Sequence, residues 1–251
     1  MTFKAKISDV SLFKDAITTI GELIDEGIFK ATKDGFGLIA ADRAMVSVVD
    51  FKMLPLSFDE YTVEDEVKIP LNLSNLISII KRATSRDKIA LELKDNKLEI
   101  TFRNASVRRF VLPLLDISEE EIPPIEQLEF KAKASIKSSV LRDGIKDAEV
   151  IADSVIFETD GKIFKMIAEG DISSSELVLE KGSDALLELS SAEHVKARYP
   201  IDYLKKMVKG YKLSESVTLR WATDYPIKLE FKALDRAYLN FVLAPRVETE
   251  D

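Results

Sequence analysis

The chain has 251 residues, of which 46% are hydrophobic and 32% charged, and it contains no cysteine. This composition is that of an ordinary globular protein, and it excludes disulfide bonds and thiolate metal sites. The formal net charge is −8, but residues 116–130 carry −6 and residues 248–251 carry −3, so the rest of the chain is slightly basic. A basic face that binds nucleic acid therefore remains open.

No apolar run reaches the roughly 20 residues that a membrane-spanning helix needs. The N-terminus shows no secretory signal pattern. We therefore expect no membrane association and an intracellular location, in the cytoplasm or nucleoid, or in the nucleus if the source is eukaryotic.

Periodicity in the first half predicts strands and two helices. Residues 3–10 alternate between apolar and polar side chains, as a strand does. We expect Ser11 to cap a helix, because apolar residues then recur at three and four positions. The further elements are expected in this order: three strands over residues 27–51, a loop or single turn over 54–61, a strand over 66–71, a helix over 72–83, a hairpin around Asp95-Asn96 and a strand over 106–115.

The second half repeats this order, with a strand over 129–136, a helix over 138–151, hairpins, a helix over 200–209, a hairpin and a final strand over 238–243. Two Asp-Gly turns, at Asp34 and Asp160, lie 126 residues apart, and the helices that begin at Asn72 and Pro200 lie 128 apart. A nearly constant offset indicates a duplicated domain. We therefore predict an α+β fold of two similar domains, each an antiparallel sheet with two helices on one face.

The acidic segment over residues 116–130 is predicted to connect the two domains. It contains no lysine or arginine, and Pro123-Pro124 rules out a continuous helix through its centre. We expect an extended, exposed connector. The predicted domains are then residues 1–115 and 131–251.

The sequence offers no active site. Residues 35–40, Gly-Phe-Gly-Leu-Ile-Ala, match a loosened dinucleotide-binding pattern, but strand-like residues follow where a helix is needed, which favours a hairpin turn. His194, the only histidine, lies in a polar run, which favours an incidental surface residue over a metal ligand or catalytic group. We expect no catalytic residue, metal or cofactor. The rival hypothesis is a two-domain enzyme that uses carboxylates in a cleft.

The polar faces of the expected helices carry cations. A solvated helix face explains any one of them, but four such faces brought together would neutralise phosphates without reading bases. The candidate nucleic-acid-binding residues are Lys14, Lys81, Arg82, Arg142, Lys146, Lys205, Lys206 and Lys209.

Three stretches resemble one known family. Residues 241–247, Phe-Val-Leu-Ala-Pro-Arg-Val followed by acids, resemble the LAPK/R ending of archaeal and eukaryotic sliding clamps of the proliferating cell nuclear antigen family. Residues 42–49, Asp-Arg-Ala-Met-Val-Ser-Val-Val, resemble the family's D-x-x-x-V-x-L/V segment, and residues 143–148 with 153–155 resemble its second-domain helix and strand. With the acidic connector, the similarity covers the whole chain and is strongest to archaeal members.

The resemblance implies a DNA clamp fold, with antiparallel sheets outside and helices lining a ring of three subunits, either identical or different. Such a ring encircles duplex DNA without sequence preference. It tethers DNA polymerase, the clamp loader, flap endonuclease and DNA ligase through short interaction peptides. Asp15 and Gly21 stand where many members have lysines, so the first helix should be a weaker DNA contact than the helix over residues 200–209.

The resemblance also implies two protein interfaces. Ring closure would pair the strand edge over residues 106–114 with the edge over 173–181 of a neighbouring subunit. The implied subunit-interface residues are Arg82, Arg108, Arg109, Asp143, Asp147, Glu176 and Val178. Partner peptides would bind an apolar groove beside the connector, although ordinary core packing explains the same side chains. The implied pocket residues are Ala41, Met45, Val46, Val48, Ile122, Pro123, Ile125, Pro226, Ala244 and Pro245.

Overall fold

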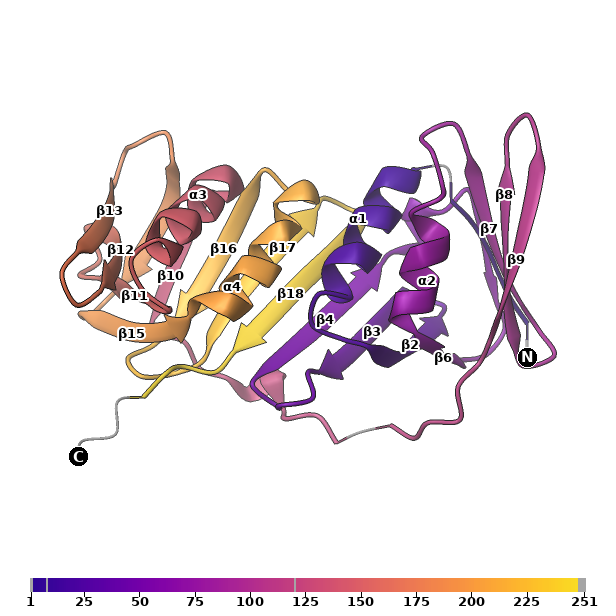
Figure 1. Ribbon diagram of the computed structural model, residues 1–251, viewed down its shortest axis with the longest axis horizontal. Helices are drawn as coiled ribbons and strands as arrows, with labels where there is room; N and C mark the ends of the chain where they lie inside the picture. Colours follow the sequence, from indigo (N-terminus) through magenta and orange to yellow (C-terminus); the bar gives the residue numbers. More distant parts are fainter. Residues whose placement is uncertain (1, 8, 120, 248–251) are drawn as a thin grey trace. The chain divides into compact units, whose positions relative to one another are not determined.

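The computed structural model describes residues 2–7, 9–119 and 121–247 (Figure 1). Its chain divides into two compact units. Unit 1 consists of residues 1–43, 49–122 and 232–239, and unit 2 consists of residues 44–48, 123–231 and 240–251. Three strands therefore contribute residues to both units, namely β4 (Ser47–Met53), β17 (Ile227–Ala233) and β18 (Ala237–Leu243).

Unit 1 contains an antiparallel sheet with the strand order β5-β1-β7-β8-β9. Its strands are β1 (Phe3–Ile7), β5 (Glu60–Val63), β7 (Lys88–Lys94), β8 (Lys97–Arg103) and β9 (Val107–Pro113). The predicted hairpin is confirmed, because Asp95 and Asn96 join β7 to β8 and both have the positive φ of a tight two-residue turn. The prediction of a loop or single turn over residues 54–61 is confirmed by the 3-10 turn Pro55–Ser57 and is wrong at residues 60 and 61, which belong to β5 and pair with β1.

Two helices and a second strand ladder complete unit 1. The ladder has the order β3-β2-β6. The bounds are β2 (Glu26–Thr32), β3 (Gly35–Ala41), β6 (Val67–Asn72), α1 (Val10–Ile20), α2 (Leu73–Ile80) and the 3-10 turn η1 (Pro55–Ser57). Helices α1 and α2 pack side by side (Figure 1).

The caps of the two unit 1 helices differ in how well the sequence predicts them. Asp9, and not the predicted Ser11, caps α1, because its carboxylate accepts a hydrogen bond from the backbone N–H of Leu12 at 3.2 Å. Asn72 caps α2 by accepting from the backbone N–H of Asn75 at 3.0 Å, where the sequence predicts the helix to begin. Both bonds satisfy donors that a helix start leaves unpaired.

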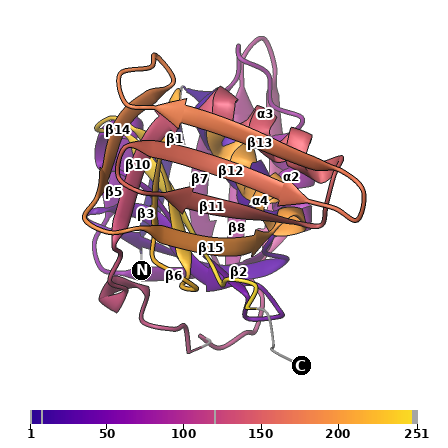
Figure 2. The same ribbon diagram turned by 90° about the vertical axis from the view of Figure 1, so that its left-hand side faces the viewer.

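Unit 2 repeats the plan of a helix pair with two sets of antiparallel strands. One sheet has the order β13-β12-β11-β15, which Figure 2 shows face on, and the other ladder runs β14-β10-β16-β17. The bounds are β10 (Ala132–Lys137), α3 (Ser138–Glu149), β11 (Ser154–Thr159), β12 (Ile163–Glu169), β13 (Ser174–Glu180), β14 (Leu186–Ser191), β15 (Val195–Pro200), α4 (Ile201–Met207), η3 (Val208–Lys212) and β16 (Ser216–Trp221). The predicted α+β fold of two similar domains is confirmed.

Each unit has its own aromatic core. In unit 1, the ring of Phe36 stacks on those of Phe3 and Phe29, with centroids 5.7 and 5.0 Å away. In unit 2, Trp221 and Phe164 pack edge to face at 5.7 Å. All five rings are buried, because alternation along a strand sends every second side chain to the covered face. Burial of each such side chain contributes about 2 kcal/mol.

The connector is partly extended and partly turned. Glu119 ties its first half to unit 1 by ion pairs with Lys30 (2.7 Å) and Lys68 (3.2 Å) on β2 and β6. The prediction of an extended connector is wrong over Ile125–Gln127, which form the 3-10 turn η2 after Pro124. Glu120 of the predicted connector and the acidic tail over residues 248–251 lie outside the described residues.

Candidate nucleic-acid interface

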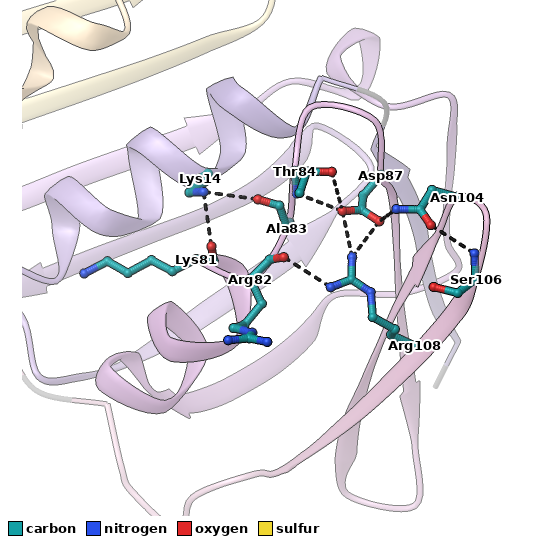
Figure 3. A network of polar contacts seen from close by, with 9 residues as sticks. All are labelled: Lys14, Lys81, Arg82, Ala83, Thr84, Asp87, Asn104, Ser106 and Arg108. Carbon is teal, nitrogen blue, oxygen red and sulfur yellow. Dashed lines mark hydrogen bonds and ion pairs between the residues drawn. The ribbon is translucent and has the colours of Figure 1, made fainter.

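The first candidate cations lie around the C-terminal end of α2. The last carbonyl groups of a helix have no partner within the helix. Lys14, on α1, supplies one by donating from Nζ to the carbonyl oxygens of Lys81 (3.3 Å) and Ala83 (3.1 Å) (Figure 3). A cation at this end also opposes the helix dipole favourably. The structure therefore places the charge of Lys14 on the backbone of the turn that follows α2.

A buried carboxylate lies behind the same turn (Figure 3). Asp87, which is 1% exposed, accepts hydrogen bonds from the backbone N–H (2.7 Å) and hydroxyl (2.9 Å) of Thr84 and from the amide of Asn104 (2.6 Å). Nη2 of Arg108 donates to both carboxylate oxygens at 2.7 Å. The bond from Arg108 is the main reason why the pKa of Asp87 lies below its usual range.

Arg108 extends this network to the edge of a sheet. It lies on β9, the last strand of the five-stranded sheet, and its Nη1 donates to the carbonyl oxygen of Arg82 at 3.2 Å. Its guanidinium also lies 5.2 Å from the centre of the Phe102 ring. These side chains are joined to one another or through the backbone of the turn of residues 81–87. We call them the Asp87 network: Lys14, Thr84, Asp87, Asn104 and Arg108.

The side chains of Lys81 and Arg82 extend away from the Asp87 network (Figure 3). Both are exposed, and within the described part of the chain neither charged group has a hydrogen-bond or ion-pair partner. Lys14, predicted to bind nucleic acid, and Arg108, predicted to lie at the subunit interface, are thus engaged with the turn of residues 81–87. The side chains of Lys81 and Arg82 project from that turn.

The cations of unit 2 lie among acids and aromatic rings. Arg142, on α3, donates to Asp143 at 2.9 Å and lies 4.7 Å from the centre of the Tyr211 ring. Lys205, on α4, forms an ion pair with Glu149 at the end of α3. Helices α3 and α4 pack together, so their candidates share one region of unit 2. The other candidates on α3, α4 and η3 are Lys146, Lys206 and Lys209.

The predicted subunit edges, β9 and β13, are end strands of their sheets (Figure 2 shows β13). Val111 on β9 and Val178 on β13 are 52% and 43% exposed, so each edge has an apolar side chain at its surface. Arg109 and Glu176 stand two positions from these valines and are exposed as well. Within the chain, Arg109 pairs with Glu99 on β8 at 3.1 Å and Glu176 with Lys165 on β12 at 2.7 Å. Both edges thus present a valine beside an ion-paired charge, and Arg109 and Glu176 have opposite signs.

The predicted partner pocket falls mainly in unit 2. The backbone N–H of Ala244 donates to the carbonyl oxygen of Val46 at 2.9 Å, which places the C-terminal segment beside residues 44–48. Met45 is 50% exposed with a φ of 57°. Val48 is 6% exposed and belongs to the core. The other predicted pocket residues are half-buried or exposed: Ala41, Val46, Ile122, Pro123, Ile125, Pro226, Ala244 and Pro245.

A hollow of about 320 Å³ lies beside the same C-terminal segment. The backbone N–H of Arg246 donates to the carbonyl oxygen of Arg198 at 2.7 Å. The guanidinium of Arg246 pairs with Asp153 at 2.6 Å, and this bond lowers the pKa of the Asp153 carboxyl. Sequence reasoning missed this hollow, although alternating cations along β15 were visible. Its lining residues are Ile156, Lys196, Ala197, Arg198, Thr223, Asp224, Arg246 and Val247.

Two features bear on the rival hypothesis of an enzyme, namely the single histidine and the grouping of potential metal ligands. His194 pairs with Glu158 at 2.9 Å on an exposed surface. Among the described residues, no group of three or more His, Cys, Asp or Glu is placed to hold a metal ion. No helix within the described ranges is long and apolar enough to cross a membrane.

Both halves of the chain match models of one protein family. Residues 2–120 match the model described as "Proliferating cell nuclear antigen, N-terminal domain". Residues 124–246 match the corresponding C-terminal domain model. The chain belongs to the proliferating cell nuclear antigen family. The resemblance in the sequence is thereby confirmed, and so is the presence of two domains.

Relatives of this family member include archaeal proteins named "DNA polymerase sliding clamp". Those from Thermococcus gammatolerans and Pyrococcus furiosus are 37% and 34% identical to it over 249 residues, which is 99% of this chain and all of each relative. Among solved structures, the proliferating cell nuclear antigen (PCNA) of Thermococcus kodakaraensis matches with a TM-score of 0.89 and 28% identity. A PCNA2–PCNA3 complex from Sulfolobus tokodaii matches with 0.90 and 29%. Each match covers 98% of this chain and all of the other.

Proposed function

We propose that this protein is a DNA sliding clamp, a subunit of a three-membered ring that encircles duplex DNA and tethers enzymes of replication and repair. The observation that carries the proposal is the match of both halves to a family whose archaeal relatives are named DNA polymerase sliding clamp. A helix pair with cations in each unit and two open sheet edges support it. A ring that holds by encirclement needs no catalytic group.

We propose that the ring closes head to tail, with β9 of one subunit beside β13 of the next. A contact that closes after three copies must join two different edges. Arg109 on one edge and Glu176 on the other have opposite charges, and a valine lies beside each. If each exchanges its partner within the chain, Glu99 or Lys165, the two can pair across the contact between identical copies. This complementarity favours a ring of identical subunits. Asp143, Asp147 and Arg82 are expected to lie at the same boundary.

We propose that the DNA contacts are made to phosphates alone, from both units. Binding is then indifferent to sequence and falls steeply with salt, by up to ~0.9 in the logarithmic slope for each phosphate contact. Lys14 is left out of this set because its Nζ is engaged by backbone carbonyls. The proposed contacts are Lys81, Arg82, Arg142, Lys146, Lys205, Lys206 and Lys209.

The proposed partners dock with a short apolar and aromatic peptide on the surface of residues 44–48, the connector and the C-terminal segment. Exposed apolar side chains rimmed by charge support this placement, and the connector acids would steer basic peptides. DNA polymerase, the clamp loader, flap endonuclease and DNA ligase are the expected partners. We expect such a peptide to bind the parent protein with a free energy of about −8 kcal/mol. Val46→Asp should abolish this binding and leave the melting temperature of the protein unchanged. Intact peptide affinity in that variant would refute the pocket.

The central experiment measures ring formation and DNA binding on the full chain. On a sizing column the protein should run at about three times its chain mass of 28.2 kDa. Arg109→Glu should shift it toward monomer, because a glutamate would then face Glu176 of the neighbour. Binding to labelled duplex DNA should weaken linearly on a logarithmic salt scale. A chain that stays monomeric and binds no DNA would overturn the proposal.

A further inference from the structure

The turn of residues 81–87 is held by more bonds than a surface turn needs. The carbonyl oxygens of Lys81, Arg82 and Ala83 all accept bonds from cations on other elements, Lys14 on α1 and Arg108 on β9. These groups would otherwise bond to water at no great cost. A turn fixed in this way is therefore a candidate for a positioned functional segment.

The fixing depends on one buried group. Asp87 accepts bonds from Thr84 within the turn, from Asn104 in the turn between β8 and β9, and from Arg108 on β9. A buried carboxylate is stable only with such partners, so loss of its charge would leave Arg108 without its main partner. The three elements are thus joined through Asp87.

We propose that Asp87 is a positioning residue for DNA contact: through Arg108 it holds the turn of residues 81–87 against β9, so that Lys81 and Arg82 project from one fixed place. The inference rests on the proposed function, because it assigns these two cations to phosphates. It adds that two other cations, Lys14 and Arg108, support the same contact by bonding to the backbone of the turn, without touching DNA.

The placement also links DNA contact to ring closure. Arg108 lies on the strand that is proposed to pair with a neighbouring subunit, and pairing restrains a strand that is otherwise at a sheet edge. A restrained β9 holds Arg108, and Arg108 holds the backbone of Arg82. Lys81 and Arg82 therefore lose less freedom on binding DNA in a closed ring than in an open one.

The test uses the sign of an electrostatic effect. Asp87→Asn removes a negative charge, so charge alone predicts tighter DNA binding. Positioning predicts weaker binding, with the salt slope reduced by up to ~0.9 for each of the two contacts. Asp65→Asn is the matched control, because it makes the same charge change on an exposed turn of unit 1 outside the network. It should leave binding unchanged or slightly tighter.

A thermodynamic cycle separates positioning from general damage. Lys81→Gln with Arg82→Gln should lower the salt slope, and adding Asp87→Asn to this pair should lower it no further, because Asp87 acts through those two residues. Additive losses, or an Asp87→Asn variant that binds DNA as the parent does, would overturn the inference. Sizing of each variant confirms that the compared proteins are the same oligomer.

Amide exchange measured without DNA tests the inference apart from the function. The backbone N–H of Thr84 should exchange faster in Asp87→Asn, since its acceptor is weakened; unchanged exchange would overturn the positioning role. If the parent binds no DNA, the proposed function fails whatever the exchange shows. Should Asp87→Asn fail to fold, Asn104→Ala removes one bond to the same carboxylate and should show the same loss of slope on a smaller scale.

Discussion

The two units differ in how they use the cations on and around their helix pairs. In unit 1, Lys14 and Arg108 are engaged with backbone carbonyls or a buried carboxylate. In unit 2, Lys205 is paired with the exposed Glu149. The cations of unit 1 are thus of two kinds: some bond to the turn of residues 81–87, and others project from it into solvent. Those of unit 2 are partly neutralised at the surface.

The difference shows that a count of basic residues on a helix is not a measure of the charge available to a ligand. A cation that satisfies buried acceptors cannot leave them without a cost. A cation paired with an exposed acid can exchange that acid for a phosphate at little cost, because exposed ion pairs contribute little. Substitutions in the two units should therefore have unlike consequences, which the following experiments measure.

The largest expected effect is on stability. Asp87→Ala should lower the free energy of unfolding by about 3 kcal/mol, because it removes a fully buried carboxylate and leaves Arg108 without that partner. Urea unfolding measures it from the midpoint at unchanged slope. Asp143→Ala breaks an exposed pair with Arg142 and should have a much smaller effect. Equal losses in the two variants would erase the distinction between the units.

Acid should reveal the same contrast. The pKa of Asp87 is lowered in the folded state, chiefly by Arg108, from an ordinary value of 3.8. Its contribution is therefore complete above that value and is lost as the pH falls through the folded pKa. Stability measured below about pH 4 should fall less steeply in Asp87→Asn than in the parent. Asp153→Asn should flatten the curve less, because its pair with Arg246 is exposed.

An intermediate effect is expected on DNA binding in unit 2. Glu149→Gln releases Lys205 from its ion pair, so affinity for duplex DNA should rise and the salt slope should steepen by up to ~0.9. Glu188→Gln is the control, because it makes the same charge change beside Lys133, away from the helices. If both variants bind alike, net charge and not the release of Lys205 explains the gain.

The smallest effect is expected at Lys14. Lys14→Met should reduce the salt slope for DNA only slightly, because Lys14 helps to hold the turn of residues 81–87 without touching phosphate. It should lower the free energy of unfolding by about 0.5 kcal/mol, since it removes a cation from the end of α2. Lys81→Met, the counterpart, should reduce the slope and leave stability nearly unchanged. A slope reduced as much in Lys14→Met as in Lys81→Met would show that the charge of Lys14 reaches DNA after all.

The sequence by itself determined the class of the fold and the family. Period-two alternation, the helix start at Asn72 and the Asp95-Asn96 turn are local signals, and each was sufficient for its element. The prediction of two similar domains needed only a nearly constant offset between landmarks. Signals of this kind act between residues close in the chain, so sequence reasoning can find them.

Only the tertiary structure decided which cations project into solvent and which form hydrogen bonds within the protein. Lys14 and Lys81 look equivalent as basic residues on helices, and Arg108 and Arg109 are neighbours on one strand. Their roles differ because Asp87 and the carbonyl groups that follow α2 lie within hydrogen-bond distance of one member of each pair. Likewise, the short strand β5 forms because it pairs with β1, which is distant in sequence. The cap of α1 depended on whether the side chain of Asp9 or of Ser11 accepts the free backbone N–H. Such choices depend on distances across the fold, which no local pattern in the chain encodes.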